Sequence, residues 1–311
     1  MNVAVEPVAG SFSPSSSQLA LAYSVCRGMA RAAAKNFYYA FMVLPRPKRR
    51  ALCAVYAYMR RCDDISDDTL IMADLRRQRL SEWLEATHRA FAGQPTDDPI
   101  LLALTDTRRN FSIPVELFDE LAYGTAMDLQ VTPDTSAAGD PVVYYRTFED
   151  LRVYCYRVAS VVGLVCIRIF GYRDKAAERF AEDLGIAFQL TNIIRDVRED
   201  AAMRRVYIPA EELKQFEIAP RDLMSPNMPV RLRWLLAAEA DRARGFYAAA
   251  GELMELIDED SQPALWVLVT IYRGLLERIA AREYDVYGPK IRLTTREKFL
   301  ILGKGLLKRI V

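Results

Sequence analysis

Apolar residues recur at three- and four-residue steps along most of the chain, which is the period of an α-helix. The clearest case is the stretch 174–200, where this step joins Phe180, Leu184, Ala187, Phe188, Thr191 and Ile194. Runs that alternate between apolar and polar residues, which would indicate strands, are few. The pattern predicts an all-α fold with about ten helices and no substantial sheet.

Prolines mark where these helices cannot continue, because proline breaks a helix interior. No proline lies within 48–94 or within 142–208, so the longest helices are expected in those two intervals. The segments TFED, from Thr147, and TTRE, from Thr294, match the capping box that begins a helix. The longest loop-like stretch, 132–144, is interpreted as an excursion within one domain.

The chain ends differ in character from its middle. Residues 1–18 are rich in Ser and Pro and lack a basic region followed by an apolar core, so we expect a disordered tail and not a signal peptide. Residues 19–311 are predicted to form a single all-α domain. We find no stretch of 18 apolar residues and therefore expect no membrane-spanning helix.

Composition narrows the classes of function. Apolar residues make up 51% and charged residues 27%, which is a globular composition. The 42 basic and 41 acidic residues nearly cancel, which argues against a nucleic-acid partner. The basic residues are 34 Arg and only 8 Lys, and Arg suits phosphate or carboxylate contacts. Five cysteines without a CxxC motif indicate buried thiols in a reducing, cytoplasmic compartment. The single histidine, His88, lies in an amphipathic pattern and is expected to be an ordinary surface residue, so multi-histidine metal sites are excluded.

An acidic run, DDISDD from Asp63 to Asp68, ends an apolar helix pattern. Asp63 and Asp67 are four residues apart, as are Asp64 and Asp68, so each pair shares a helix face. Such pairs repel and weaken a helix by a few tenths of a kcal/mol. The run fits a solvated helix end. However, acidic residues at a helix C-terminus interact unfavourably with the helix macrodipole, and this cost favours a functional role for the run.

A second polar line follows one face of a later helix. Asn192, Asp196 and Asp200 lie at four-residue steps, and Gln189 extends the line by three residues. Apolar neighbours such as Ile193 and Val197 place this line at the border of the interior. A hydrogen-bond network between helices would satisfy it, and so would a bound cation.

Two acid-bearing helices that face each other would surround a crowded anionic space. Carboxylates in such a space resist joint ionisation unless cations enter. Oxygen ligands suit Mg²⁺, which commonly shares the phosphates of a substrate. Arg60, Arg61, Arg195 and Arg198 lie among the acids and could bind phosphate oxygens. We infer a helical cavity in which several Mg²⁺ ions hold a diphosphate.

Small residues mark one face of a further apolar helix, within YCYRVASVVG from Tyr154. Ala159, Ser160 and Gly163 recur on that face, which leaves room either for close helix packing or for a ligand. Packing is the simpler interpretation at this point.

The acidic motifs, with YCYRVA between them, resemble those of the squalene/phytoene synthase family, the head-to-head prenyl transferases. The matching segments are AKNFYYAFMVLP (34–45), VYAYMRRCDDISDD (55–68), YCYRVASVVG (154–163) and QLTNIIRDVREDAAMRRVYIP (189–209). The likeness spans residues 20–300. It implies an all-α isoprenoid-synthase bundle around a deep apolar cavity, with prenyl diphosphates as substrates and several Mg²⁺ ions.

The likeness also implies a role for individual residues. The metal ligands would be Asp63, Asp64, Asp67, Asn192, Asp196 and Asp200. The catalytic residues would be Asp63, Asp67, Asp196, Asp200 and Tyr154. Substrate contacts would come from Lys35, Phe37, Tyr56, Arg60, Gln189, Arg195 and Tyr272. The prenyl tail would lie against Val158, Ala159, Val162 and Gly163. Ala34 replaces a serine that relatives often carry, and Lys290 and Arg292 both fit a basic position near the C-terminus.

The implied reaction is the Mg²⁺-dependent 1'-1 condensation of two prenyl diphosphates through a cyclopropylcarbinyl diphosphate. YCYRVAS with the following VCIRIFGY resembles the C30 enzymes more than the C40 ones, which favours two farnesyl diphosphates and a squalene-type product. The alternative is phytoene synthesis from geranylgeranyl diphosphate. NADPH would be required only if the product is squalene. A terpene cyclase or chain elongator could use the same metal chemistry, and an inactive helical scaffold is the reading from a different class.

The last segment, TTREKFLILGKGLLKRIV from Thr294, is apolar on one side and carries several basic residues. We hypothesise that this helix rests on an anionic membrane surface, at the inner face of the membrane. A final helix that packs on the domain and exposes its lysines to solvent would show the same pattern.

Overall fold

The computed structural model describes residues 14–33, 35–68, 70–130 and 140–308. These residues form fourteen α-helices, two other helical turns and one very short sheet, so the predicted all-α fold is confirmed. The first helix begins at Ser16, inside the segment predicted to be a tail, and residues 1–13 lie outside the described part.

The first eight α-helices run from the N-terminus to the middle of the chain. They are α1 (Ser16–Ala33), α2 (Lys35–Met42), α3 (Arg46–Ser66), α4 (Ala73–Phe91), α5 (Pro99–Phe111), α6 (Val115–Gln130), α7 (Phe148–Cys155) and α8 (Val161–Phe170). The remaining helices are α9 (Ala176–Ala202), α10 (Ala210–Gln215), α11 (Val230–Ala249), α12 (Leu253–Leu256), α13 (Gln262–Ala280) and α14 (Thr295–Lys308). The turns are η1 (Tyr156–Ser160), which is π-helical, and η2 (Pro220–Met224), which is a 3-10 turn.

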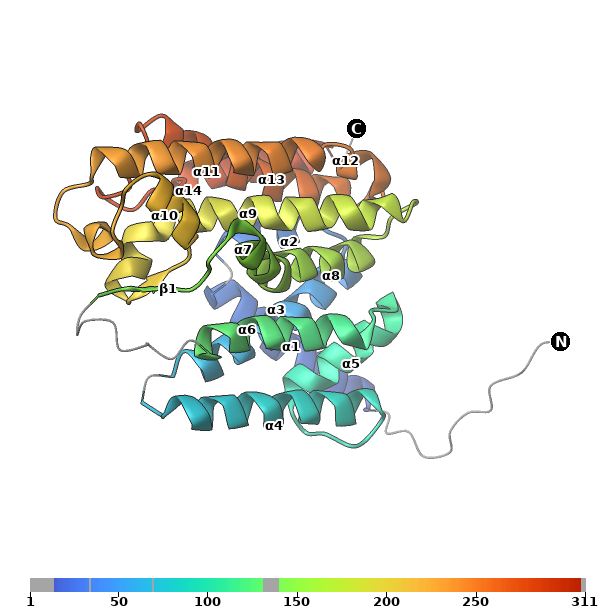
Figure 1. Ribbon diagram of the computed structural model, residues 1–311. Coiled ribbons are helices and arrows are strands. Elements are labelled where there is room, and N and C mark those ends of the chain that lie inside the picture. The colour runs from blue at the N-terminus through green and yellow to red at the C-terminus, as the bar shows by residue number, and fades with distance from the viewer. Residues whose placement is uncertain (1–13, 34, 69, 131–139, 309–311) are drawn as a thin grey trace.

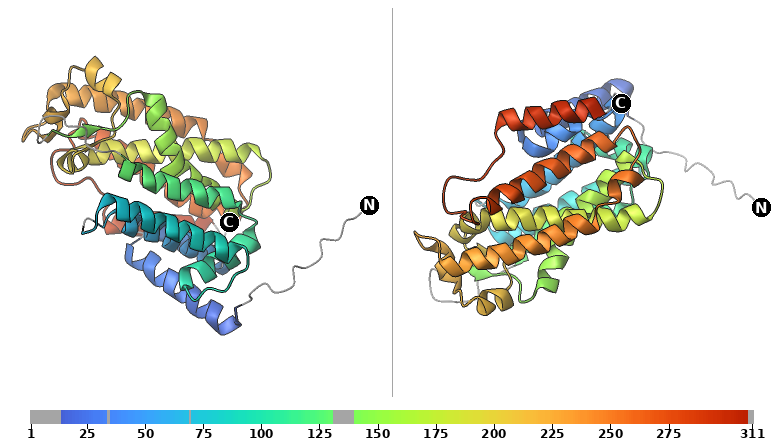
Figure 2. Two further views of the ribbon diagram at one scale, coloured as in Figure 1. Left: turned by 60° about the horizontal axis from the view of Figure 1, so that its bottom comes forward. Right: turned by 90° about the horizontal axis from the view of Figure 1, so that it is seen from above.

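The helices stack in layers, with α4 and α6 on one side, α11 and α13 on the other, and α7, α8 and α9 between them (Figure 1). Helix α8 packs against both α3 and α9, so the two helices predicted to carry acidic motifs flank a common neighbour. The last helix, α14, packs against α13 and α2, and the view from above shows it at the edge of the bundle (Figure 2).

Local sequence signals place several helix ends. The side chain of Thr147 accepts from the backbone N–H of Asp150, and the Asp150 carboxylate accepts from the backbone N–H of Thr147, which confirms the predicted capping box. Thr294 and Glu297 make the same reciprocal pair before α14. Each pair satisfies backbone donors that a helix start would otherwise leave open.

The predicted long helix over 148–170 is interrupted in its middle. The π-helical turn η1 separates α7 from α8, and such turns are frequent at functional sites. Here α9 approaches closely: a Cβ on Gly185 would lie 2.4 Å from the Cα of Ser160. Glycine at this position therefore allows the backbones of α9 and η1 to come into contact.

The same stretch, Phe148–Phe170, is the one helical run with the length and composition of a membrane span among the described residues, with a mean hydropathy of 1.7. Half of its most apolar window is buried within the protein. The sequence analysis did not identify this run. Because it packs against α9 and α6, its apolar character is that of a core helix.

A two-residue parallel sheet joins β1 (Val142–Val143) to β2 (Arg205–Val206). The stretch 132–144, which is loop-like in sequence, ends with β1, and residues 131–139 lie outside the described part. A two-residue strand that pairs with a segment 63 residues away leaves no local pattern in the sequence. The sheet fixes Arg205 beside the end of α9.

The histidine and the cysteines, for which the sequence predicted no catalytic role, lie in the environments expected of them. His88 is on α4, its side chain is about half exposed, and its Nε2 lies 2.6 Å from Oδ1 of Asp119, which confirms an ordinary surface role. All five cysteines are free thiols and four are buried. Burial raises the pKa of Cys62 and of Cys166 to about 12, so these thiols are inert at neutral pH.

Candidate active site

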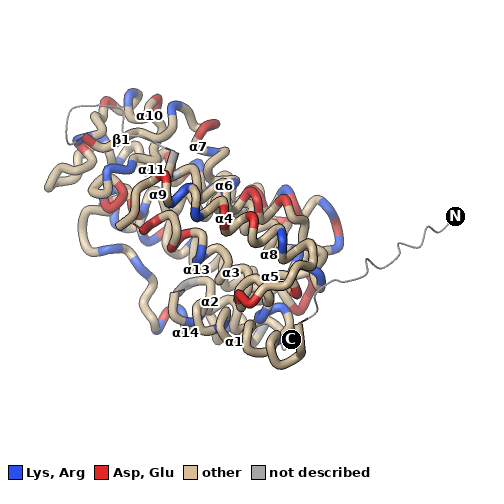
Figure 3. Tube along the Cα trace, turned by 90° about the horizontal axis from the view of Figure 1, so that it is seen from below, with Lys and Arg blue, Asp and Glu red and all other residues tan. Residues whose placement is uncertain are grey.

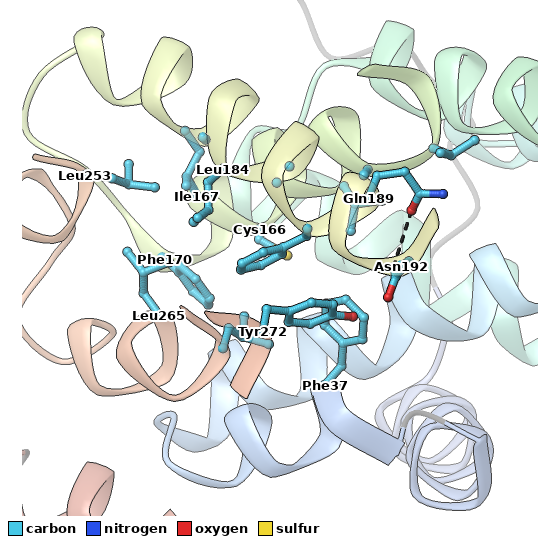
Figure 4. Close-up of a pocket in the computed structure, with 18 of the residues that line it drawn as sticks. Phe37, Cys166, Ile167, Phe170, Leu184, Gln189, Asn192, Leu253, Leu265 and Tyr272 are labelled. Carbon is cyan, nitrogen blue, oxygen red and sulfur yellow. Dashed lines mark hydrogen bonds between the residues drawn. The ribbon is translucent and has the colours of Figure 1, made fainter. Parts of the chain in front are cut away.

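An apolar inner cavity of about 160 Å³ lies between α3, α8, α9 and α13. Its walls come from residues far apart in the sequence, which Figure 4 shows as sticks. They are Phe37, Met59, Val158, Ala159, Val162, Gly163, Cys166, Ile167, Phe170, Ala181, Leu184, Gly185, Phe188, Gln189, Asn192, Leu253, Leu265, Leu268 and Tyr272. All four residues predicted to contact a prenyl tail are among them, and so are Phe37, Gln189 and Tyr272.

The small residues of η1 and α8 serve both of the uses that the sequence left open. Gly163 lines the inner cavity, and a Cβ there would lie 3.0 Å from the backbone oxygen of Ala181 on α9. Ser160 is fully buried and donates from Oγ to the backbone oxygen of Glu182 at 2.6 Å. The same row of small residues therefore allows close packing against α9 and leaves space for a ligand.

Aromatic rings form one wall of the inner cavity. Phe188 and Tyr272 are stacked with ring centroids 4.2 Å apart, and Phe37 lies 5.9 Å from Tyr272 (Figure 4). Burial raises the pKa of Tyr272 to about 12, so its hydroxyl stays protonated at neutral pH. Such ring faces can stabilise a positive charge that develops beside them.

A polar pocket of about 180 Å³ adjoins the inner cavity, and the two share Met59 and Val158. The remaining residues of the pocket are Cys62, Asp63, Ser66, Asp67, Leu121, Thr125, Tyr154 and Arg205. The first acidic motif and Tyr154 are thus brought together at the edge of the apolar space.

Arg205 links the two acidic motifs and was missed by the sequence analysis. It lines the polar pocket with Asp63 and Asp67, and its charge partly opposes the rise that burial and Asp196 cause in the pKa of Asp200 on α9. Its position depends on the β1–β2 pairing, which no local pattern announces. A guanidinium at this point can bind phosphate oxygens between the two rows of acids.

The second acidic row holds its central carboxylate in an ion-pair cluster. Asp196 pairs with Arg195 and with Lys290, whose Nζ lies 3.0 Å from Oδ1 of Asp196. Burial alone would raise the pKa of Asp196, but the hydrogen bonds and charges of these two bases outweigh it and lower the pKa. Lys290, rather than Arg292, is therefore the basic residue that the fold brings to this motif.

Asp200 stands in contrast to Asp196. Burial and the charge of Asp196 raise the pKa of Asp200 from 3.8 to about 7. The positive charges near Asp200 are therefore too few to offset its burial and the charge of Asp196. This is expected where carboxylates crowd together at a cation-binding site.

Gln189 and Asn192 occupy the polar end of the inner cavity (Figure 4). The side-chain N–H of Asn192 donates to Oε1 of Gln189 at 3.4 Å. The line of polar residues predicted from the sequence thus begins at the cavity with Gln189 and Asn192. It continues along α9 to the carboxylates of Asp196 and Asp200.

Tyr154 is packed into a group of tyrosines beside the polar pocket. Its ring is stacked on that of Tyr207 with centroids 5.2 Å apart, and the ring of Tyr145 lies 5.4 Å away. All three rings are buried. This packing fixes the direction of the Tyr154 side chain, which α7 alone would leave free to change rotamer.

Several predicted site residues line neither cavity. Asp64 forms an ion pair with Arg60 at 2.6 Å, and both side chains are nearly half exposed. Tyr56 lies on the same helix, and burial, opposed by the charge of Arg60, raises its pKa. Lys35 begins α2, but its side chain lies outside the described part of the structure. Arg195, Asp196 and Asp200 also line neither cavity, and the roles assigned to all of the predicted site residues stay predictions.

The donor chemistry of the two rows fits Mg²⁺. Carboxylates and one amide oxygen are the ligands that hard cations prefer. Within the described residues, no three acidic, cysteine or histidine side chains converge on one point. Arg195 and Lys290 instead pair with Asp196. The residues suited to the ions are Asp63, Asp67, Asn192, Asp196 and Asp200, with a substrate phosphate to complete the coordination.

Comparison with known proteins agrees with this geometry. The model of the squalene/phytoene synthase family matches residues 30–297. The chain is 34% identical over 299 residues to the 15-cis-phytoene synthase of Synechocystis sp., covering 92% of this chain and 85% of that protein. It is 36% identical over 293 residues to the phytoene synthase of Mycobacterium tuberculosis, covering 93% and 92% of the two chains.

Solved structures with the same fold have other products in their names. A crystal structure of a dehydrosqualene synthase in complex with a ligand superposes with a TM-score of 0.81 at 29% identity, covering 93% of this chain and 96% of that one. A squalene synthase from Alicyclobacillus acidocaldarius superposes with a TM-score of 0.77 at 28% identity, covering 87% and 97%. The helical arrangement is thus common to enzymes named for different products.

Proposed function

Since the chain belongs to the squalene/phytoene synthase family, whose members are prenyltransferases, we propose that it joins two geranylgeranyl diphosphates head to head to form phytoene. The observation that carries the proposal is the junction of a polar pocket and an apolar cavity at Met59 and Val158. A prenyl diphosphate has the same division, with a charged head and an apolar tail. The names of the relatives favour the C40 product over the squalene-type product expected from the sequence.

In the proposed reaction, the bases of the site bind the diphosphate head. Arg205, Arg195 and Lys290 present charged donors beside the two acidic rows. Mg²⁺, when bound by the carboxylates, would supply the Lewis acid that neutralises charge on the departing diphosphate. Donors fixed before the reaction stabilise that charge without reorganisation, which lowers the barrier to ionisation.

The inner cavity would protect the allylic cation. Its walls are apolar except at the end formed by Gln189 and Asn192, so water would find few polar partners along the rest of it. The stacked rings of Phe188 and Tyr272 line this cavity together with Gln189, and the first carbons of a tail would lie against them. The double bond of the second substrate attacks the cation, and proton loss then gives a cyclopropylcarbinyl diphosphate. We assign proton acceptance to the released diphosphate or to Tyr154, which lines the polar pocket and whose ring is stacked on that of Tyr207.

The test is product mass. The purified chain is incubated with Mg²⁺ and either geranylgeranyl or farnesyl diphosphate, with and without NADPH, and the lipid extract is measured by mass spectrometry together with diphosphate release. We expect a C40 hydrocarbon, two diphosphates per product, and no reaction in EDTA. A longer prenyl diphosphate would identify a chain elongator, and a cyclic C15 or C20 product a cyclase. No turnover of either substrate would defeat the proposal and favour an inactive scaffold.

A C30 product is the second candidate. It is favoured by the dehydrosqualene and squalene synthases among the solved structures. In the same assay it would appear as a C30 hydrocarbon from farnesyl diphosphate, and a requirement for NADPH would identify the product as squalene.

We also propose that the protein works in the cytoplasm at a membrane surface, through α14. Its Phe299, Leu300 and Leu307 side chains are 58%, 66% and 64% exposed although they are large and apolar. Lys304 is exposed on the same helix, and basic residues around an apolar strip favour anionic lipid. Charged residues of both signs are otherwise interspersed over the helices (Figure 3).

Vesicle binding tests this location. The full chain should sediment with phosphatidylglycerol vesicles more than with phosphatidylcholine vesicles, and a Leu300→Ser, Leu307→Ser variant should lose this binding. Val230→Ser, at an equally exposed position on α11, should bind as the unchanged protein does. Equal binding by all three proteins would show that α14 is only the last helix of the bundle.

A further inference from the structure

The inner cavity has a second end, opposite its polar one. Gln189 and Asn192 lie at one end, and Leu184, Leu253 and Leu265 lie at the other (Figure 4). The three leucines are 7%, 2% and 4% exposed, so they close the cavity from solvent. A substrate whose head is at the polar end would direct the far end of its tail toward them.

The same three leucines also line an outer groove of about 510 Å³ on α11, α12 and α13. This groove is bordered by Trp266, Val269 and Met254, which are partly exposed. Because Leu184, Leu253 and Leu265 face both spaces, the wall between the cavity and the groove is a single layer of side chains.

The volumes indicate that this wall must move when a long tail binds. An apolar cavity of about 150 Å³ holds a benzene ring, which has six carbons. The inner cavity, at about 160 Å³, is therefore too small for a tail of fifteen or twenty carbons. The outer groove supplies the missing space directly behind the leucines, and its floor is apolar.

The leucines differ in how firmly the fold holds them. Leu184 belongs to α9, which has 27 residues, and Leu265 to α13, which has 19. Leu253 belongs to α12, which has four residues and follows the exposed Gly251. A short helix is anchored by few backbone hydrogen bonds, so Leu253 is the member of the wall that can be displaced most easily.

We propose that Leu184, Leu253 and Leu265 form a displaceable partition that sets the length of tail the enzyme accepts, and that the far end of a C20 tail reaches the outer groove past Leu253. The proposal rests on the prenyl synthase function and assigns its chain-length specificity to named residues. A shorter C15 tail reaches less far past the partition and therefore needs less of the groove.

Substitution of Leu253 tests the partition through substrate preference. We measure the ratio of kcat/KM for the C20 substrate to that for the C15 substrate. Leu253→Ala should raise this ratio about tenfold and Leu253→Phe should lower it about tenfold, since small changes in an apolar pocket discriminate by 10–200-fold. Leu256→Ala, on the same short helix but lining neither the cavity nor the groove, should leave the ratio within twofold. If the alanine variant does not fold, Leu253→Val should shift the ratio in the same direction.

The outcomes separate this inference from the proposed function. If the unchanged protein is active and the Leu253 variants keep its ratio, the partition is refuted while the synthase function stands. If Leu256→Ala changes the ratio as much as Leu253→Ala, a general loosening of α12 and not the partition sets the preference, and the proposal is overturned. Inactivity of the unchanged protein toward both substrates refutes the synthase function itself.

Trp266 offers a measurement that does not require turnover, because it lines the groove and not the inner cavity. Unreactive C15 and C20 prenyl thiodiphosphates are bound in the presence of Mg²⁺, and the tryptophan emission is compared with that of a Trp266→Phe variant. The C20 analogue should change the Trp266 emission more than the C15 analogue does. Saturable binding of the C20 analogue without a change in Trp266 emission would overturn the proposal.

Discussion

The polar pocket and the inner cavity are nearly equal in volume and share two wall residues, yet they are opposite in chemistry. The pocket presents Asp63, Asp67 and Arg205 to its contents, whereas the cavity presents hydrocarbon and aromatic rings. Under the proposed function, this difference lets one site ionise a substrate and then keep the cation from water. The pocket would bind the charged head, and the cavity would hold the reactive carbon chain.

The comparison predicts its largest effect for a carboxylate of the pocket. Asp67→Asn removes an anionic oxygen that the proposed metal-bound diphosphate needs, and kcat should fall on the order of 10³-fold, by analogy with the loss of a fixed electrostatic group. KM should change much less, because the tail still binds in the cavity. Steady-state kinetics of diphosphate release measures both quantities.

Asp68→Asn is the matched control for this loss. Asp68 is adjacent in sequence, but it lines neither cavity and lies 3.9 Å from Arg79 in a largely exposed ion pair. Its substitution should leave kcat within a factor of about two, since such pairs contribute little. Equal loss of activity in the two variants would mean that the general negative charge of this helix end matters, and the distinction between pocket and surface would fail.

The next effect concerns the wall of the cavity. Gly185→Ala places a Cβ within 2.4 Å of the Ser160 backbone, so α9 and η1 must separate, and we expect about 1–3 kcal/mol of destabilisation. Gly245→Ala on α11 meets no atom within 4 Å and should stabilise by up to about 1 kcal/mol, the usual gain in a helix. Urea unfolding gives both values. A stable Gly185→Ala protein would show that this crossing is looser than the structure indicates.

The smallest expected effect is a pH dependence of the free energy of unfolding that arises from Asp200, in the second acidic row. The pKa of Asp200 is about 7 in the folded protein and 3.8 ordinarily, so the fold favours its protonated form. The associated stability is complete below pH 4 and is lost as the pH rises through 7. In EDTA, Asp200→Asn should therefore be about 1–2 kcal/mol more stable than the unchanged protein at pH 8, and the difference should shrink at pH 5. Denaturant titrations at the two pH values measure this. Parallel pH dependence in both proteins would contradict it.

Much of the fold follows from local signals in the sequence. The proline-free intervals contain α3, α4, α8 and α9, and the capping boxes mark the starts of two helices. Helical period and caps act within a few residues, so one sequence suffices to detect them. The π-helical turn η1 was missed because its cause is the approach of α9 at Gly185, which is a tertiary contact.

The candidate site divides in the same way. The acidic steps on α3 and α9 could be read from spacing, and the cavity-lining residues Val158 and Gly163 were identified through the family likeness. Arg205 could not be identified with the site, because a long-range strand pairing places it there. Lys290 could be named only together with Arg292, because the ion pair that distinguishes them is long-range. The outer groove is also a product of tertiary packing among α11, α12 and α13.

The division of the site into a pocket for the head and a cavity for the tail is tested most directly by a crystal structure with Mg²⁺ and an unreactive geranylgeranyl thiodiphosphate. The account predicts the diphosphate among Asp63, Asp67 and Arg205, with the first carbons of the tail between Val158 and Phe188. A diphosphate bound away from both acidic rows, or a tail that leaves the inner cavity empty, would contradict it.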